Sequence, residues 1–360
     1  MLSVQAQNPP HPRAPPLRRP MTVHSKPKPT NIKELESNPL IIDELMQIRC
    51  QLTGDQPIFS YPSPGINYVD YTPRQLDIFA FRAAQEYAVH IPPRSSSDKK
   101  PSVVALLGPS NLDYLIALLA LSKLGHTVLF LSTRISKEAY LSLLKATEST
   151  NLVIHDSFKD MAEKLKAERL DLKVNGFVSQ PAYNYPLGAA VNTRMSQNLD
   201  LQKESKHIAW IIHSSGSTGL PKPIYQTQAA AVMNYATNMN MNGFVTLPLY
   251  HAHGLSSVFR AIHSGKQIHL YNASLPLAKS YIMDIMRVHK FEIFYGVPYV
   301  LKLLAESQEG IELLAACKIV MFGGSACPDS LGDRLVENGV NLVSHYGTYV
   351  YLWMSLAFQC

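Results

Sequence analysis

The feature that most constrains the fold of this chain is an alternation of short apolar runs with helix-like segments between residues 103 and 154. The apolar runs have the length of buried strands, and a capping residue begins each segment between them. Strands are therefore predicted at 103–107, 127–131 and 152–154, and helices at 111–124 and 136–147. The order βαβαβ implies a parallel sheet with helices packed on its faces, which predicts an α/β fold. No G-x-G-x-x-G follows the first strand, so a dinucleotide fingerprint is absent.

A further α/β series follows in the C-terminal part of the chain. Helices are predicted at 282–288, 298–306 and 328–338, and strands at 292–297, 318–322 and 341–346. Nearer the N-terminus, Thr72 suits a helix cap, with Pro73 at the first helical position and Gln75 completing a capping box. A chain of 360 residues with 46% hydrophobic residues has a substantial core available, which excludes wholesale disorder.

The first 31 residues differ in composition from the rest. They are rich in proline, and up to residue 30 they carry basic residues and no acidic ones: Arg13, Arg18, Arg19, Lys26 and Lys28. We expect a disordered basic arm at 1–31, with a solvated tail favoured over an SH3-like ligand or a transit peptide. Much of the net charge of +6 therefore resides in the arm, and the nearly balanced remainder gives no sign of a nucleic-acid partner.

Cysteine spacing and hydropathy indicate the cellular compartment of the protein. The cysteines, Cys50, Cys317, Cys327 and Cys360, form no C-x-x-C pair, which fits a reduced, cytoplasmic location. The N-terminus lacks the apolar segment of a secretory signal. The most apolar run, 113–131, is interrupted by lysine, glycine and histidine, so no membrane span is predicted.

The stretch with the clearest chemistry is the loop 214–222, which has the sequence SSGSTGLPK and lies between two predicted strands. Its glycines let backbone N–H groups turn toward an anion, its hydroxyls add donors, and Lys222 adds a charge suited to phosphate. The spacing Gly216-x-x-Gly219-x-x-Lys222 differs from the Walker P-loop, whose lysine is followed by Ser or Thr at a helix start. The loop is therefore predicted to bind phosphate, and a generic NTPase is disfavoured.

Three further strand ends carry residues suited to ligand binding, because ligands of open α/β sheets bind beyond the carboxyl ends of strands. His251 and His253 follow one strand; they lack the third ligand of a metal site, and the plain alternative is a pair of loop histidines. Two glycines and a serine at 323–325 follow another strand and let a flat ligand approach the backbone, and they also suit a tight turn. The third strand end is 344–348, with the sequence SHYGT.

The string HSSGSTGLPKPI at 213–224 and the start of a Y-G-T-T-E motif at 346–348 resemble the adenylate-forming superfamily, which contains acyl-CoA synthetases, luciferases and the adenylation domains of non-ribosomal peptide synthetases. The extended loop is most similar to fungal NRPS-like adenylate-forming reductases, and the resemblance covers residues 32–348. It implies a large core of stacked βαβ subdomains with a smaller β region. It also implies that a carboxylate attacks the α-phosphate of ATP in the presence of Mg²⁺, before transfer of the acyl group to CoA or a carrier thiol.

The resemblance also implies roles for residues of this sequence. ATP binding falls on the loop and two strand ends: Ser214, Ser215, Gly216, Ser217, Thr218, Gly219, Lys222, Gly323, Gly324, Ser325, Tyr346, Gly347 and Thr348. The acyl pocket is lined by His251, Val297 and Gly323, with His251 at the gating position. No acidic residue lies between Tyr250 and Ile268 to hold a substrate ammonium, which favours a carboxylic acid without an α-amino group.

The sequence departs from the family pattern after Thr348. Tyr349 and Val350 stand where a second threonine and the Mg²⁺-binding glutamate are expected, and residues 349–360 match nothing in the family. The ribose-binding aspartate, the C-terminal lid domain with its catalytic lysine, and the carrier and reductase domains are not in this sequence. We therefore expect a truncated gene model or a read-through end, with severely impaired adenylation, no certain catalytic residue, no metal ligand and an open sheet edge. The alternative is a non-catalytic fragment that binds nucleotide or a partner.

Overall fold

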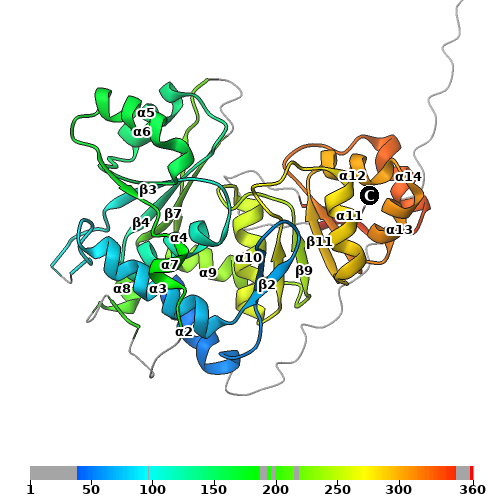
Figure 1. The fold of residues 1–360 in the computed structure, drawn as a ribbon, viewed down its shortest axis with the longest axis horizontal. Coiled ribbons are helices and arrows are strands. Elements are labelled where there is room, and N and C mark those ends of the chain that lie inside the picture. The colour runs from blue at the N-terminus through cyan, green and yellow to red at the C-terminus, as the bar shows by residue number, and fades with distance from the viewer. Residues whose placement is uncertain are drawn as a thin grey trace, which may run out of the picture. The chain divides into compact units, whose positions relative to one another are not determined.

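The computed structural model describes residues 39–95, 97–186, 193–195, 199–214 and 219–345, together with the backbone of 357–359. The arm predicted at 1–31 lies outside these residues. The described chain forms two sheets with helices on their faces, which confirms the α/β prediction (Figure 1). The six-stranded sheet has the order β6-β5-β3-β4-β7-β8, and the eight-stranded sheet has the order β14-β13-β12-β11-β9-β10-β1-β2.

The six-stranded sheet contains the βαβαβ unit predicted from the sequence. Its strands are β3 (Val103–Leu107), β4 (Thr127–Leu131), β5 (Asn151–Ile154), β6 (Lys173–Gly176), β7 (Ile208–His213) and β8 (Pro223–Thr227). The helices of this region are α3 (Pro73–Ala88), α4 (Leu112–Lys123), α5 (Lys137–Ala146), η1 (Asp156–Phe158), α6 (Lys159–Glu168), α7 (Gln180–Tyr183) and α8 (Leu201–Glu204). All neighbouring strands are parallel except β7 and β8, which form an antiparallel hairpin.

The eight-stranded sheet is parallel from β13 to β1 and antiparallel at both margins. Its strands are β1 (Phe59–Pro62), β2 (Tyr68–Tyr71), β9 (Gly243–Val245), β10 (Ile268–Leu270), β11 (Ile293–Gly296), β12 (Ile319–Phe322), β13 (Leu342–His345) and β14 (Ala357–Gln359). The remaining helices are α2 (Ile42–Thr53), α9 (Gln228–Ala236), α10 (Ala252–Ser264), α11 (Lys279–Val288), α12 (Pro298–Ala305), α13 (Gln308–Ala315) and α14 (Asp329–Glu337).

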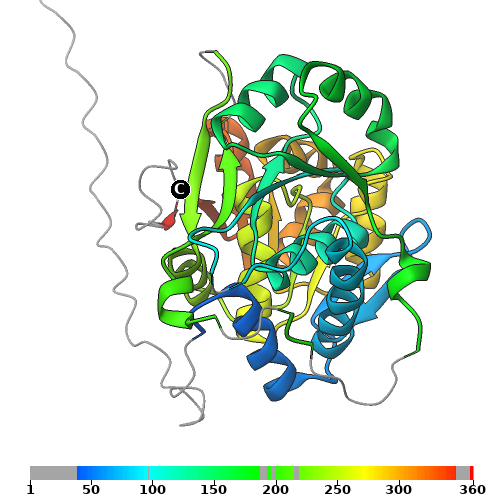
Figure 2. The ribbon, with the colours of Figure 1, turned by 90° about the vertical axis from the view of Figure 1, so that its left-hand side faces the viewer.

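Side chains of each sheet alternate between two cores, as the period of a strand requires. In β3, Leu106 joins the central core with α3 and α4, whereas Leu107 packs with α5 and α6. In β11, Tyr295 joins the central core and Phe294 packs with α11 to α14. Helix α10 contributes to the central core between the sheets, and Figure 2 shows the six-stranded sheet in front with the orange helices of the eight-stranded sheet behind it.

Two helix caps predicted from the sequence are present. The Thr72 hydroxyl accepts a hydrogen bond from the Gln75 amide (3.2 Å), and the Gln75 side chain accepts one from the Thr72 amide (2.9 Å). Asn111 Oδ1 accepts from the Tyr114 amide (2.9 Å) at the start of α4. Both caps satisfy backbone donors that a helix start leaves without intrahelical partners.

A buried cation links three helices of the central layer. Lys123, at the end of α4, is 2% exposed, and its Nζ lies 2.8 Å from Asp43 of α2 and 2.5 Å from Asp77 of α3. Both aspartates are themselves buried. A buried ammonium is stable only when carboxylates and hydrogen bonds replace its hydration, so this triad holds α2 against α3 and α4.

Two expectations are corrected by the fold. Residues 252–264 form α10, so His253 is a helical residue of the first turn, not a loop histidine. Strand β14 pairs antiparallel with β13, so the edge of β13 is covered where an open edge was expected. In the part of the chain that the structure describes, no helix is long and apolar enough to cross a membrane.

Candidate functional site

The base of the predicted phosphate loop is the turn between β7 and β8. The Ser214 amide donates to the Lys222 carbonyl (3.0 Å), and the Lys222 amide donates to the Ser214 hydroxyl (2.9 Å). These two bonds close the loop at its ends, and Lys222 is exposed. Gly219 has φ of 150° and is also exposed. The predicted phosphate contacts Ser215, Gly216, Ser217 and Thr218 lie outside the described residues.

His213 connects the base of this loop to the end of the neighbouring strand, β4. Its Nε2 accepts from the Ser132 amide (3.1 Å) just after β4, and its Nδ1 lies 2.8 Å from the Ser214 carbonyl oxygen. Because Nε2 accepts, the proton of the neutral ring is on Nδ1, which donates to Ser214. Burial lowers the pKa of His213, and this is opposed by the bond to Ser214, so the neutral form persists at neutral pH. The ring therefore fixes the first residue of the loop.

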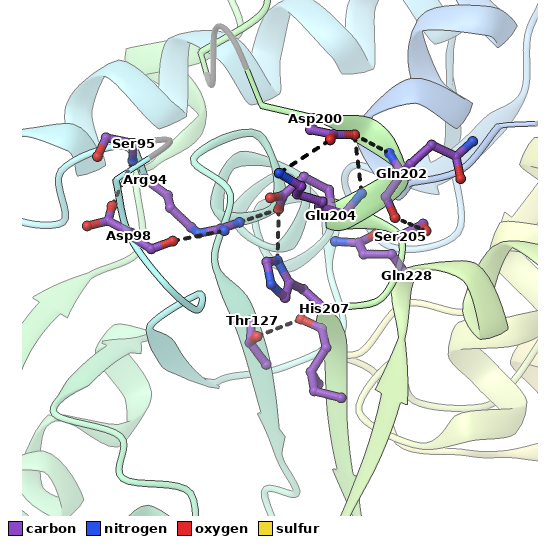
Figure 3. A network of polar contacts seen from close by, with 12 residues as sticks. Arg94, Ser95, Asp98, Thr127, Asp200, Gln202, Glu204, Ser205, His207 and Gln228 are labelled. Carbon is purple, nitrogen blue, oxygen red and sulfur yellow. Dashed lines mark hydrogen bonds and ion pairs between the residues drawn. The ribbon is translucent and has the colours of Figure 1, made fainter.

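The far end of β7 is anchored by a polar network (Figure 3). Arg94 pairs with Glu204, whose carboxylate also lies 3.2 Å from Nδ1 of His207, the residue before β7. The Thr127 hydroxyl donates to the Ile208 carbonyl (2.6 Å) at the first residue of the strand. The strand that carries the loop is thus held at both of its ends.

One segment after β9 connects the carboxyl ends of the two sheets. The Leu249 amide donates to the Ser110 hydroxyl after β3 (2.8 Å), and the Tyr250 hydroxyl lies 3.0 Å from that of Thr133 after β4. His251 follows as the N-cap residue of α10 and is exposed. Partial desolvation, His213 and Arg134 lower the pKa of His251. This junction brings the predicted gating histidine to the same edge as the loop.

The two glycines after β12 form a close-packed turn at the carboxyl edge of the eight-stranded sheet. A Cβ atom on Gly323 would lie 2.9 Å from the backbone oxygen of His345 and 3.1 Å from Nδ1 of His253, so no larger residue fits without a shift. Gly324 has φ of 88°, which favours glycine. A Cβ on Gly324 would lie 3.7 Å from Val297 Cγ1, after β11. The structure therefore brings Val297, Gly323 and Gly324 together, with Ser325 next to them and exposed.

Both ring nitrogens of His253 are buried at this edge, although the residue as a whole is partly exposed. Its ring centroid lies 4.6 Å from that of His345 and 6.0 Å from that of Tyr295. Neither ring nitrogen has a hydrogen-bond partner among the described residues. Burial, then His345 and Arg260, hold the pKa of His253 well below its usual value, so its imidazole is neutral. An unpartnered buried imidazole is a candidate contact for a ligand.

The structure therefore describes some of the predicted site residues, whereas others lie outside the described ranges. Ser214, Gly219, Lys222, His251, Val297, Gly323, Gly324 and Ser325 lie at carboxyl strand ends or in the loops that follow them. Tyr346, Gly347 and Thr348 lie outside the described residues. Sequence reasoning did not assign a role to His213 or Arg260. The helical spacing of Leu255, Val258 and Ile262 would have indicated α10 and, with it, the inward position of Arg260.

A magnesium site is not formed by the described residues. In the ranges that the structure covers, no group of three or more His, Cys, Asp or Glu residues could hold a metal ion. Val350, at the position of the expected metal ligand, lies outside those ranges. We therefore assign no step to a metal ion.

Comparison with known proteins decides the family. The profile described as "AMP-binding enzyme" matches residues 94–348. This chain belongs to the AMP-binding enzyme family. Members of the AMP-binding family activate carboxylic acids as acyl adenylates, using ATP and Mg²⁺.

Among relatives, the chain is 31% identical over 292 residues to an atypical non-ribosomal peptide synthetase of Acremonium egyptiacum, covering 75% of the chain and 26% of that protein. It is 27% identical over 332 residues to an adenylate-forming reductase of Stachybotrys bisbyi, covering 88% of the chain and 31% of that protein. The chain thus spans between about a quarter and a third of these AMP-binding relatives.

Solved structures of the AMP-binding family share the fold. The o-succinylbenzoate CoA synthetase of Bacillus subtilis has a TM-score of 0.68 at 21% identity, covering 88% of this chain and 61% of that chain. The N-terminal domain of FACL13 from Mycobacterium tuberculosis has a TM-score of 0.71 at 16% identity, covering 87% of this chain and 77% of that domain. The Bacillus synthetase has also been solved with AMP and with ATP and a magnesium ion.

Proposed function

We propose that this chain binds ATP and a carboxylic acid and promotes attack of the carboxylate on the α-phosphate, giving an acyl adenylate and pyrophosphate, with turnover severely reduced because Val350 stands where the Mg²⁺-binding glutamate is expected. The observation that carries the proposal is the junction at 249–251. There the Leu249–Ser110 and Tyr250–Thr133 hydrogen bonds join the carboxyl ends of both sheets. The Ser214–Lys222 hydrogen bonds that close the loop 214–222 lie at the same edge. This junction suits a reaction between two bound molecules, because positioning supplies much of the rate.

The proposed roles follow the strand ends. ATP supplies the electrophilic phosphorus and the pyrophosphate leaving group. The loop 214–222 binds its phosphates, and Gly323, Gly324 and Ser325 border the adenine, with Tyr346 stacked on it and Thr348 at a phosphate. His251 and Val297 line the acid pocket. A carboxylic acid is already ionised at neutral pH, so the reaction needs no general base; the chain holds the acid and the phosphate in line and excludes water.

We also assign residues 32–348 to one adenylating domain, which extends the matched range toward the N-terminus. Residues 1–31 are assigned to an arm and 349–360 to a tail outside that domain. The acid lacks an α-amino group, because the segment 250–268 that enters and forms α10 carries no acidic residue. The acyl acceptor is CoA or a carrier-protein thiol, and the location is cytoplasmic.

The direct test is ATP–pyrophosphate exchange with a panel of aryl and aliphatic acids. We expect acid-dependent exchange that Lys222→Ala lowers by about tenfold or more, as expected when a donor to developing phosphate charge is lost. The matched control is Lys203→Ala, which removes another exposed lysine, whose Nζ lies 3.8 Å from Asp200. Exchange no higher than the acid-free blank with every acid would count against adenylation.

A nucleotide-binding module without turnover is the second candidate. It is favoured by the lack of a metal-ligand group among the described residues. Titration calorimetry with ATP separates the two: binding without exchange supports the module, whereas exchange with any acid excludes it.

A further inference from the structure

The side chain of His251 is not held by the helix that it precedes. His251 is the N-cap residue of α10, and its imidazole forms no capping hydrogen bond with the helix start. A histidine side chain has two rotatable bonds, so the ring can in principle point toward the proposed acid pocket or away from it. Its direction therefore depends on the side chains that it contacts.

The backbone around His251 is fixed on both sides. The Leu249 amide donates to the Ser110 hydroxyl (2.8 Å), and the His251 amide donates to the Pro248 carbonyl (3.2 Å). Within the first turn of α10, a Cβ atom on Gly254 would overlap the Pro248 carbonyl, so the helix packs closely on this segment. Rotation of the His251 ring is thus the main freedom that remains.

The ring that His251 contacts is that of Tyr250. The two ring centroids lie 4.9 Å apart at an interplanar angle of 64°, which is an edge-type contact. Tyr250 is 5% exposed and packs in the central core, and its hydroxyl lies 3.0 Å from that of Thr133. The phenol is a rigid plane held by the core and by this hydrogen bond, so it presents one fixed surface to the imidazole.

The segment that carries Thr133 is itself anchored. Thr133 follows Ser132, which is 4% exposed. The Ser132 amide donates to His213 Nε2 (3.1 Å), and the Ser132 carbonyl accepts from the Tyr140 hydroxyl (2.8 Å). The Thr133 hydroxyl therefore extends from a backbone that hydrogen bonds hold in place, and it can fix the position of the Tyr250 phenol.

We propose that Tyr250 is a positioning residue, which directs the His251 imidazole at the acid pocket and is itself held by Thr133. The inference rests on the proposed function, in which His251 lines that pocket. Tyr250 acts through His251, so the affinity for the acid depends on the Tyr250–Thr133 hydrogen bond, and the affinity for ATP depends on it much less.

The test is ATP–pyrophosphate exchange with the acid that gives the highest rate. Tyr250→Phe keeps the ring and removes its hydroxyl, and Thr133→Val removes the partner hydroxyl. Each should raise KM for the acid about fivefold, because a freed side chain must be ordered again on binding, and should leave KM for ATP within about twofold. Thr133→Ser keeps the hydroxyl and should retain the wild-type KM. The matched control is Tyr61→Phe, which removes another buried tyrosine hydroxyl, 3.2 Å from Asn272, and should change neither KM.

The double variant Tyr250→Phe/Thr133→Val separates positioning from unrelated effects. It should lose no more than either single variant, because both remove the same hydrogen bond. Losses that multiply, or equal rises in KM for the acid and for ATP, would overturn the inference. A purely structural Tyr250 would give a lower Tm with an unchanged KM for the acid, which would overturn it as well. Should Tyr250→Phe fail to fold by circular dichroism, the comparison of Thr133→Val with Thr133→Ser decides.

A second readout does not depend on turnover. If no acid supports exchange, adenylation fails, and the position of the His251 ring is followed by NMR of histidine-labelled protein, with the resonance assigned from its loss in His251→Gln. Desolvation, then His213 and Arg134, lower the pKa of His251 in the wild type. An imidazole released from Tyr250 becomes better solvated, so its pKa should rise toward the ordinary value in Tyr250→Phe and Thr133→Val and not in Tyr61→Phe. An unchanged pKa in the first two variants would overturn the positioning role.

Discussion

Replacing His213 with phenylalanine should loosen the base of the phosphate loop while leaving the packing of β7 in place. His213 is 4% exposed, accepts from the Ser132 amide and donates to the Ser214 carbonyl. Phenylalanine keeps an aromatic ring at the position but has neither donor nor acceptor. The Ser132 amide, on a residue that is itself buried, would lose its partner.

The expected magnitude follows from that orphaned amide. A buried donor without a partner costs about 1–3 kcal/mol, and the free energy of unfolding should fall by this amount. If the free energy of ATP binding is weakened by about 1.4 kcal/mol of this loss, the Kd for ATP rises about tenfold. Urea unfolding followed by circular dichroism gives the first quantity, and titration calorimetry with ATP gives the second.

His207→Phe is the matched control, because His207 lies next to the other end of the same strand. It lies 3.2 Å from Glu204 and touches no part of the loop, so its replacement should lower stability and leave ATP affinity within about twofold. Equal ATP affinity in the wild type and His213→Phe would refute the role assigned to His213. An equal loss of affinity in both variants would refute it as well.

Three further predictions concern stability. Lys123→Met leaves two buried carboxylates without their cation and should lower the free energy of unfolding in urea by about 3–5 kcal/mol; a loss below about 1 kcal/mol would contradict the triad. Gly323→Ala brings a Cβ to 2.9 Å from a backbone oxygen and should destabilise by about 1–3 kcal/mol. By contrast, Gly332→Ala in α14 meets nothing within 4 Å and should stabilise by up to about 1 kcal/mol, so similar signs for the two glycine variants would be inconsistent with the structure. Burial, then the charge of the neighbouring His289, lowers the pKa of His269 to about 4. The neutral imidazole therefore stabilises the folded state above pH 6.5, and the free energy of unfolding should fall by up to about 3 kcal/mol as pH falls from 6.5 toward 4. His269→Phe should flatten that part of the stability–pH curve.

Local signals made much of the six-stranded sheet predictable. The caps at Thr72 and Asn111 and the apolar run of β3 each depend on a few neighbouring residues, and all three appear where the sequence indicated. The strand that precedes the two histidines is short and ends at Val245. The residues after it leave the ladder: the Thr246 amide donates to the Tyr295 carbonyl, and Leu249 bonds to Ser110, so tertiary contacts set that boundary.

The candidate site was predictable in composition but not in its connections. The glycines and hydroxyls of the loop are visible in the sequence, because they are contiguous. The bond between His213 and Ser132 joins residues 81 positions apart, and the Arg94–Glu204 pair spans 110. The contacts of Arg260 with Asn234 join residues 26 positions apart. No local sequence pattern encodes these long-range contacts, so they are seen only in the three-dimensional structure.

The junction at 249–251 also bears on how the two proposed binding regions influence each other. The Leu249 bond fixes it to β3, the Tyr250 contact fixes it to β4, and α10 begins one residue after His251. Because β4 also anchors the loop through Ser132 and His213, a shift at the phosphate side is passed through backbone and hydrogen bonds to the first turn of α10. That turn follows His251 and carries His253. Occupation of the loop by phosphates and of the proposed acid pocket beside His251 by an acid should therefore be coupled, with each ligand stabilising one arrangement of the same segment.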